Sequence, residues 1–205
     1  MKKILFVASL ALASATAQAS SASYSDFLSW ADEVAGIVTT DTFNSYSFGE
    51  SSSLGTSVTL GANSFSIDGG QLYGNGKALS YDAPYHSSNY LEWQNNNPNT
   101  LTITLGDYTQ AFGVNYGQFY GVAGSYSVVL GNGDSFTVDG NTGYSFFGVI
   151  STAAFKTIKI TASDFPTIDN LSVGPVAAVP EPGTYALMLS GLGLMGLVGR
   201  RRSRR

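Results

Sequence analysis

The chain has 205 residues, which suits one ordinary domain or two small ones, and its ends differ in charge from its middle. Residues 20–179 hold thirteen carboxylates and three lysines, a formal charge of −10, whereas the other basic residues cluster at both tips. This acidic body argues against nucleic-acid binding, because phosphates are neutralised by clustered Lys and Arg. A sequence without cysteine excludes disulfides and thiolate metal sites, and its single histidine excludes a multi-histidine metal centre.

The first 19 residues have the three parts of a secretory signal peptide. Lys2 and Lys3 form a positive n-region, residues 4–13 are apolar, and Ala17 and Ala19 form a small-x-small cleavage site. We therefore expect export, with cleavage after Ala19. A short buried first helix is the alternative, but it does not explain the basic tip, the apolar run and the small-residue ending together.

Residues 20–175 are predicted to form one extracellular, mostly β domain that begins with a helix. The helix is expected at residues 25–35, because its apolar side chains fall on one side, namely those of Phe27, Leu28, Ala31, Val34 and Ala35.

Alternation of apolar and polar residues follows the helix. Residues 100–105, 125–130 and 156–161 read as half-buried strands, and turn signals stand at residues 68–70, 74–76, 131–134 and 139–141. About ten to twelve short strands at this spacing predict an all-β fold, an antiparallel jelly-roll-like β-sandwich.

Aromatic and polar residues concentrate in residues 81–93, which suits a glycan site because rings stack on sugars while polar groups bind hydroxyls. The candidate glycan-binding residues are Tyr81, Tyr85, His86, Tyr90 and Trp93. The alternative is that Tyr90 and Trp93 pack in the core or at a sheet edge. Residues 113–124, with Tyr116, Phe119 and Tyr120, form a second aromatic segment.

An enzymatic function has little support in the sequence. Asp82 and Glu92 would be the paired carboxylates of a glycosidase, but the sequence does not fix their separation. Neither a G-x-S-x-G elbow nor a glycine-rich phosphate loop is present. We therefore expect a protein that is not an enzyme.

One candidate calcium site involves Asp169 and Asn170, with Asp164 or a turn carboxylate such as Asp139 completing the ligands, since Ca²⁺ takes six to eight oxygens. The alternative is that Asp169 and Asn170 satisfy backbone groups at a strand bend. No local calcium-loop motif is present, and no other cofactor is expected.

Residues 176–205 form a second candidate targeting signal, at the other end of the chain. A small-residue linker leads to Pro180, Glu181 and Pro182, then to an apolar run at residues 185–199, then to an arginine-rich tail that includes Arg200, Arg201 and Arg202. As a helix, the apolar run spans roughly 22 Å of a roughly 30 Å hydrocarbon core, so we expect a single short transmembrane helix. Arginines after the helix favour the cytoplasmic side, which leaves the body outside.

This C-terminal arrangement resembles the PEP-CTERM sorting signal of exported Gram-negative proteins. The resemblance implies recognition by exosortase, a membrane-embedded cysteine-protease-like transpeptidase, and removal of the helix and arginine tail after transient anchoring in the inner membrane. Residues 146–151, 154–160 and 168–174 also resemble the closing strands of jelly-roll-like cargo domains of that family. A plain single-pass anchor behind a proline-rich linker is the alternative.

The sequence and the resemblance together lead to one functional expectation and one alternative. We expect an exported, non-enzymatic surface or extracellular-matrix protein, processed by exosortase and associated with exopolysaccharide or biofilm. The alternative is a lectin-like carbohydrate-binding module, with or without calcium.

Overall fold

The structure is a computed structural model that describes residues 21–34, 36–49, 51–76, 88–94, 99–118, 124–140, 144–162, 166–175 and 189–192. The chain divides into two compact units, Ser20–Ala177 and a unit made of Met1–Ala19 with Ala178–Arg205. The elements of the first unit are β1 Ala22–Tyr24, α1 Phe27–Glu33, β2 Thr39–Asp41, β3 Ser52–Gly55, β4 Ser57–Leu60, β5 Asn63–Ile67, β6 Gln71–Asn75, β7 Tyr90–Gln94, β8 Asn99–Gln118, β9 Ser125–Leu130, β10 Ser135–Asp139, β11 Ser145–Ala162 and β12 Pro166–Gly174.

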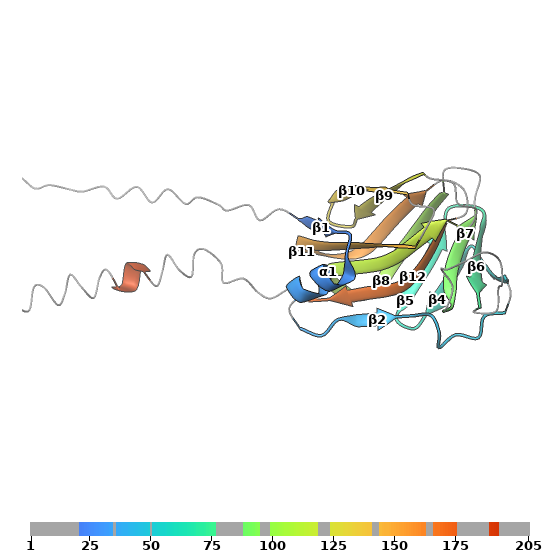
Figure 1. Cartoon of the computed structure of the whole chain (residues 1–205), viewed down its shortest axis with the longest axis horizontal. Coiled ribbons are helices and arrows are strands. Elements are labelled where there is room, and N and C mark those ends of the chain that lie inside the picture. The colour runs from blue at the N-terminus through green and yellow to red at the C-terminus, as the bar shows by residue number, and fades with distance from the viewer. Residues whose placement is uncertain are drawn as a thin grey trace, which may run out of the picture. The chain divides into compact units, whose positions relative to one another are not determined.

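The strands form two antiparallel layers of a sandwich-like fold (Figure 1). The first sheet has the order β4, β5, the first half of β8, the second half of β11, β9 and β10. The second sheet has the order β1, the first half of β11, the second half of β8, β12, β7, β6 and β3, with β2 beside the end of β12. The predicted antiparallel β-sandwich is therefore confirmed, while its jelly-roll connection stays a prediction.

Two long strands, β8 and β11, belong to both sheets. Asn99 pairs with Ala162 in the first sheet, Tyr116 pairs with Ser145 in the second, and the register between the strands shifts around Phe155. The Tyr126 hydroxyl of β9 donates to the Gly117 carbonyl at 2.7 Å, which brings the far end of β8 against the first sheet. Both strands therefore bend over near residues 105–110 and 151–156, and we call this the bend end of the sandwich.

The core lies between the two sheets and is built by alternation along the strands. In β8 of the first sheet, Leu101, Ile103 and Leu105 are buried in it, as the sequence predicted. Trp93, Phe65 and Phe112 are fully buried in the same cluster.

The outer face of the first sheet is covered mainly by hydroxyl side chains. The register of its six strands aligns them in rows across the sheet, and Lys159, Asp139 and Val129 interrupt the rows. The hydroxyl residues are Ser57, Thr59, Ser64, Ser66, Thr100, Thr102, Thr104, Ser125, Ser127, Ser135, Thr137, Thr157 and Thr161. Pairs of them bond to each other, as Thr100 does to Thr161 at 2.8 Å. This sheet face is solvated mainly through hydroxyls.

Helix α1 packs on the outside of the second sheet. The Asp26 side chain caps it by accepting from the Ser29 N–H at 2.9 Å, and Trp30 is its one buried side chain. The predicted helix is confirmed, but it is shorter than residues 25–35, and the predicted buried face is wrong for Phe27 and Leu28, which are 39% and 69% exposed. The tryptophan, rather than the aliphatic stripe, fixes how the helix sits because it fills the space over two paired glycines.

Two of the four predicted turns are found, one is wrong, and the turn at residues 139–141 includes Asn141, which lies outside the described residues. Gly69, Gly70 and Gly133 have positive φ, as tight turns require. Residues 74–76 were expected to turn, but Gly74 and Asn75 belong to β6. A Cβ on Gly74 would lie 2.5 Å from the ring of Phe48, so this glycine permits close packing instead of a turn.

Of the predicted apolar helix at 185–199, the structure describes residues 189–192, which form one helical turn. Within the described part of the chain, no helix has the length and apolarity needed to cross a membrane. The predicted signal peptide at residues 1–19, with Ala17 and Ala19, lies outside the described residues, as do Pro180, Glu181, Pro182 and the arginines Arg200, Arg201 and Arg202.

Candidate functional site

The predicted aromatic glycan site is only partly described. Tyr81, Tyr85 and His86 lie outside the described residues. Tyr90 and Trp93 lie in β7 and are both 0% exposed, so neither ring offers a surface on which a sugar stacks. Trp93 is part of the core between the sheets, which agrees with the packing alternative for that residue.

Glu92 lies between these two residues and is held inside the protein by amide groups. Its carboxylate accepts from Asn75 Nδ2 at 3.0 Å and from Gln94 Nε2 at 2.6 Å. Burial raises the pKa of the Glu92 carboxyl, while the two amide contacts oppose the rise. Asp82, its proposed partner in a glycosidase, lies outside the described residues.

Asp169 is a second buried carboxylate, at a strand irregularity in β12. It is 1% exposed, accepts from the Asn170 N–H at 2.6 Å and accepts from the Ser88 hydroxyl. Asn170 adopts φ 52°, and the register of β12 on β8 shifts between Asp169 and Ser172. Burial raises the pKa of the Asp169 carboxyl to about 6.

These contacts bear on the predicted calcium site without deciding it. Asp169 already satisfies a backbone N–H at a strand bend, which is the alternative the sequence left open. Asp164 lies outside the described residues, and within the described ranges no cluster of three His, Cys, Asp or Glu side chains has the arrangement of a metal site. The calcium site with Asp164, Asp169 and Asn170 stays a prediction.

Glu92 and Asp169 lie close to two buried tyrosines. The charge of Glu92 raises the pKa of Tyr90, and the charge of Asp169 raises that of Tyr144, in each case after the larger effect of burial. The structure therefore brings residues that the sequence had placed in separate sites into one polar cluster of the second sheet. Its carboxylates bond to neighbouring side chains and backbone, so its observed contacts are structural.

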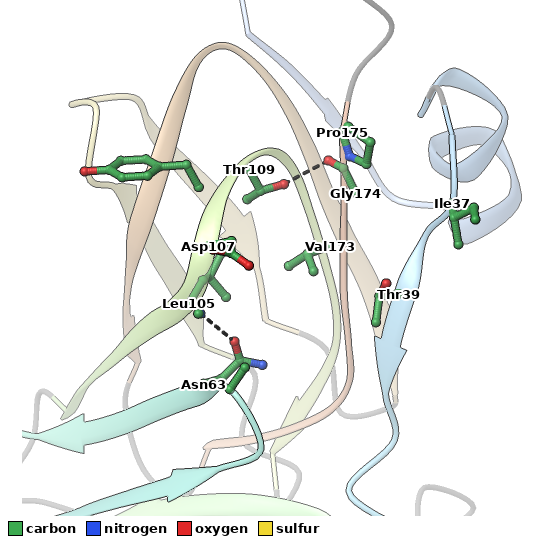
Figure 2. A pocket seen from close by; sticks show the side chains of 12 residues that line it. Ile37, Thr39, Asn63, Leu105, Asp107, Thr109, Val173, Gly174 and Pro175 are labelled. Carbon is green, nitrogen blue, oxygen red and sulfur yellow. Dashed lines mark hydrogen bonds between the residues drawn. The ribbon is translucent and has the colours of Figure 1, made fainter.

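An open pocket of about 410 Å³ lies at the bend end of the sandwich (Figure 2). Four segments line it: residues 37–39, the β4–β5 turn with Asn63, residues 105–109 of β8, and the end of β12 through Pro175. Leu105 and Val173 supply apolar surface, and Asn63, Thr39 and Asp107 supply polar groups around the hollow. This mixture of apolar surface and a few convergent polar groups is typical of small-ligand sites.

Two hydrogen bonds set the shape of the pocket. Asn63 Oδ1 accepts from the Gly106 N–H at 3.2 Å, which joins the β4–β5 turn to β8. The buried Thr109 hydroxyl donates to the Gly174 carbonyl at 2.8 Å, which holds the end of β12 against β8 (Figure 2). Sequence reasoning missed this pocket because its residues belong to four separate segments; the only local signal was polar residues at two glycine-flanked bends.

A second polar network also escaped the sequence analysis. The carboxylate of Asp134 in the β9–β10 turn accepts from Ser21 at 2.5 Å and from Ser151 at 2.7 Å. Asn132 Nδ2 donates to the Ser151 hydroxyl at 2.7 Å and to the Ala153 carbonyl at 2.9 Å. The bonds from Ser21 and Ser151 lower the pKa of the Asp134 carboxyl, and the network ties the chain just before β1 to the bend of β11.

Three comparisons with known proteins add to this geometry. Residues 178–203 match the family described as the PEP-CTERM protein-sorting motif. No curated protein matches the chain. Among solved structures, the chain is similar to one titled "The structure of the family 32 CBM from C. perfringens NanJ in complex with galactose", at 18% identity and a TM-score of 0.35, over 55% of this chain and 93% of that chain.

The match at residues 178–203 covers the proline-flanked glutamate, the apolar run and most of the arginine tail. The motif begins four residues after Gly174, the last residue of β12, so it directly follows the β domain in the chain. It indicates export through membrane-anchored sorting. The chain carries a PEP-CTERM sorting motif at residues 178–203, as its resemblance predicted, and is consistent with a substrate of exosortase.

Proposed function

We propose that this protein is an exported surface or matrix protein whose β-sandwich, residues 20–175, is the functional cargo and whose C-terminal segment is removed by exosortase. The observation that carries the proposal is the sorting motif at residues 178–203, directly after the last strand of the domain. After removal of the apolar run and the arginine tail, the domain would be free of its membrane anchor and would remain at the cell surface or in the medium.

Intact mass spectrometry of the protein from the medium and from the cell envelope of its native host tests this proposal. We expect a product that begins near Ser20 and lacks residues 185–205, and we expect it to depend on exosortase. Replacing Pro180 and Pro182 by Ala should leave the tail attached, because the extended segment that the enzyme grips is lost. Pro175→Ala, outside the motif, is the matched control and should be processed normally. A wild-type protein that keeps its tail and stays in the envelope contradicts the proposal.

We also propose that the processed domain associates with extracellular polysaccharide. The hydroxyl-covered face of the first sheet supports this, because it offers many donors and acceptors and only two charged side chains, Lys159 and Asp139, within its rows. A host strain that lacks its exopolysaccharide should release the protein into the medium, whereas the wild-type strain should retain it. Equal retention in both strains contradicts the association.

The proposed role is non-enzymatic. Among the described residues that line the pocket, Asp107 is the single carboxylate, whereas glycosidases of the common type need two carboxylates that flank the scissile bond. Glu92, one of the two carboxylates that the sequence offered for a glycosidase, is buried and accepts hydrogen bonds from two side-chain amides. The purified protein should release no reducing sugar from extracellular polysaccharides. Release that Glu92→Gln abolishes would identify an enzyme instead.

A further inference from the structure

We propose that the pocket at the bend end binds one neutral hexose unit of a polysaccharide, with the Asp107 carboxylate accepting hydrogen bonds from the sugar hydroxyls. This inference rests on the proposed surface function and specifies the ligand class and the residues that contact it. Tyr90 and Trp93, the two predicted glycan-binding residues that the structure describes, do not line this pocket.

The size of the pocket suits a single small ligand. Its volume of about 410 Å³ lies within the range of roughly 300–1,000 Å³ that small-molecule sites occupy. It is open to solvent, and Ile37 on one wall is 85% exposed, so the end or a branch of a longer polymer can enter.

The polar atoms in the pocket divide into those already used and those still available. The Thr109 hydroxyl is already bonded to the Gly174 and Ala111 carbonyls, and Asn63 Oδ1 already accepts from the Gly106 N–H. In the described part of the chain, Asp107 forms neither a hydrogen bond nor an ion pair, and the Nδ2 of Asn63 has no acceptor. A carboxylate and an amide donor are therefore available in the lining of the same hollow, to which Thr39 also contributes a hydroxyl.

This combination selects among ligand classes. An anionic ligand is disfavoured, because the one charged side chain in the described lining is the carboxylate of Asp107 and the body as a whole is acidic. A purely apolar ligand that covers the exposed Asp107 carboxylate would take it out of water without giving it a partner, which costs free energy. A hexose fits both requirements, since adjacent hydroxyls donate to the carboxylate while its C–H face contacts Leu105 and Val173.

Saturation-transfer NMR on the full chain, in a detergent without a sugar headgroup, tests the proposal. The probes are the methyl glycosides of glucose, galactose and mannose, with glucuronate as the anionic comparison and glucosamine as the cationic one. We expect at least one neutral hexoside to bind and glucuronate not to bind. Failure of all three neutral hexosides, or binding of glucosamine alone, overturns the proposal.

Variants locate the binding. Asp107→Asn keeps the size of the side chain but removes the charged acceptor, and we expect affinity for the hexoside to fall about tenfold or more. Thr39→Val, which removes an exposed hydroxyl and keeps the β-branched shape, should weaken binding by a few-fold. Asp32→Asn removes an exposed carboxylate on α1, outside the pocket, and should bind like the wild type. Unchanged affinity in Asp107→Asn contradicts the assignment.

The outcome is separable from that of the sorting proposal. Hexoside binding is measured on the purified chain and does not depend on removal of its tail. A protein that is processed normally but binds no hexoside refutes only the pocket assignment. A protein that binds hexosides with an intact tail in the envelope refutes only the processing.

Discussion

Gly113 and Gly148 face each other across β8 and β11, and the indole of Trp30 lies over this pair. A Cβ on Gly148 would lie 2.6 Å from Trp30 Cδ1, and one on Gly113 would lie 2.7 Å from the Phe146 ring. The indole Nε1 donates to the Val149 carbonyl at 3.2 Å. Because the two glycines have no Cβ, they leave a space on the outside of the sheet in which the seven-residue helix buries its tryptophan; we call this space the glycine seat.

Gly148→Ala should destabilise the domain by about 1–3 kcal/mol, because the added methyl group overpacks a site with no free space. Gly49→Ala is the matched control, since a Cβ there would approach only the Ser52 hydroxyl, at 3.4 Å. Urea unfolding followed by tryptophan fluorescence measures both variants. Equal loss of stability in the two variants would show that the glycine seat under Trp30 does not require glycine at position 148.

Asp134→Ala should loosen the N-terminal strand of the domain. The change removes the acceptor shared by Ser21, Ser151 and Asn132, and we expect a loss of about 1–2 kcal/mol. Amide exchange should become faster in β1, because β1 pairs only with β11 among the described strands. Asp32→Ala on the exposed face of α1 should change neither measurement by much. Unaltered exchange in β1 would exclude a tethering role for the carboxylate.

The pH dependence of stability should contain a contribution from Asp169. Its pKa is raised to about 6 in the folded state, so the folded protein binds this proton more tightly than the unfolded chain does. The resulting stability is fully present below the unfolded pKa, near 4, and is lost as pH rises through about 6. Asp169→Asn cannot titrate, so its stability should fall less between about pH 4 and about pH 7 than that of the wild type.

Urea unfolding at several pH values compares that slope between the two proteins. The Asn side chain keeps an oxygen that can accept from the Asn170 N–H, so the fold should survive the change. Asp139→Asn, at an exposed position of β10, is the control for loss of one carboxylate. A slope in Asp169→Asn equal to that of the wild type contradicts the predicted titration.

Thr109→Val should weaken the attachment of the last strand. The buried hydroxyl of Thr109 bonds to Gly174 and Ala111, and the isosteric valine leaves these backbone groups without that partner at a cost of about 1–3 kcal/mol. Amide exchange at Val173 and Gly174 should rise, and hexoside binding should weaken because the end of β12 forms one wall of the pocket. Thr104→Val, on the exposed face of the same strand, should affect neither property.

Local patterns accounted for much of the sandwich. Alternation predicted the half-buried segments of β8, β9 and β11, because side chains of a strand point to opposite faces and only one face meets the core. The same pattern did not reveal that β8 and β11 each continue through a bend into the other sheet. Such continuity depends on pairing between residues such as Asn99 and Ala162, which lie far apart in the chain.

Residue type alone was a weaker guide to the candidate site. Tyr90 and Trp93 have the chemistry of a sugar platform, but the structure buries both, and Glu92 between them is held by Asn75 and Gln94. The pocket with Asp107 and Asn63 arises where separate segments meet, so it cannot be predicted from any short stretch of sequence.

The sequence by itself determined the sorting signal of this protein and its mostly β-strand structure, because a sorting motif and a two-residue period are read from neighbouring residues alone. Only the tertiary structure decided which glycines lie in turns and which make room for a packed aromatic ring. It also decided which aromatic side chains are buried and where a ligand can enter. Those properties follow from contacts between residues distant in the chain, which place Phe48 over Gly74, Trp30 over Gly148, and Asn63 beside Gly106.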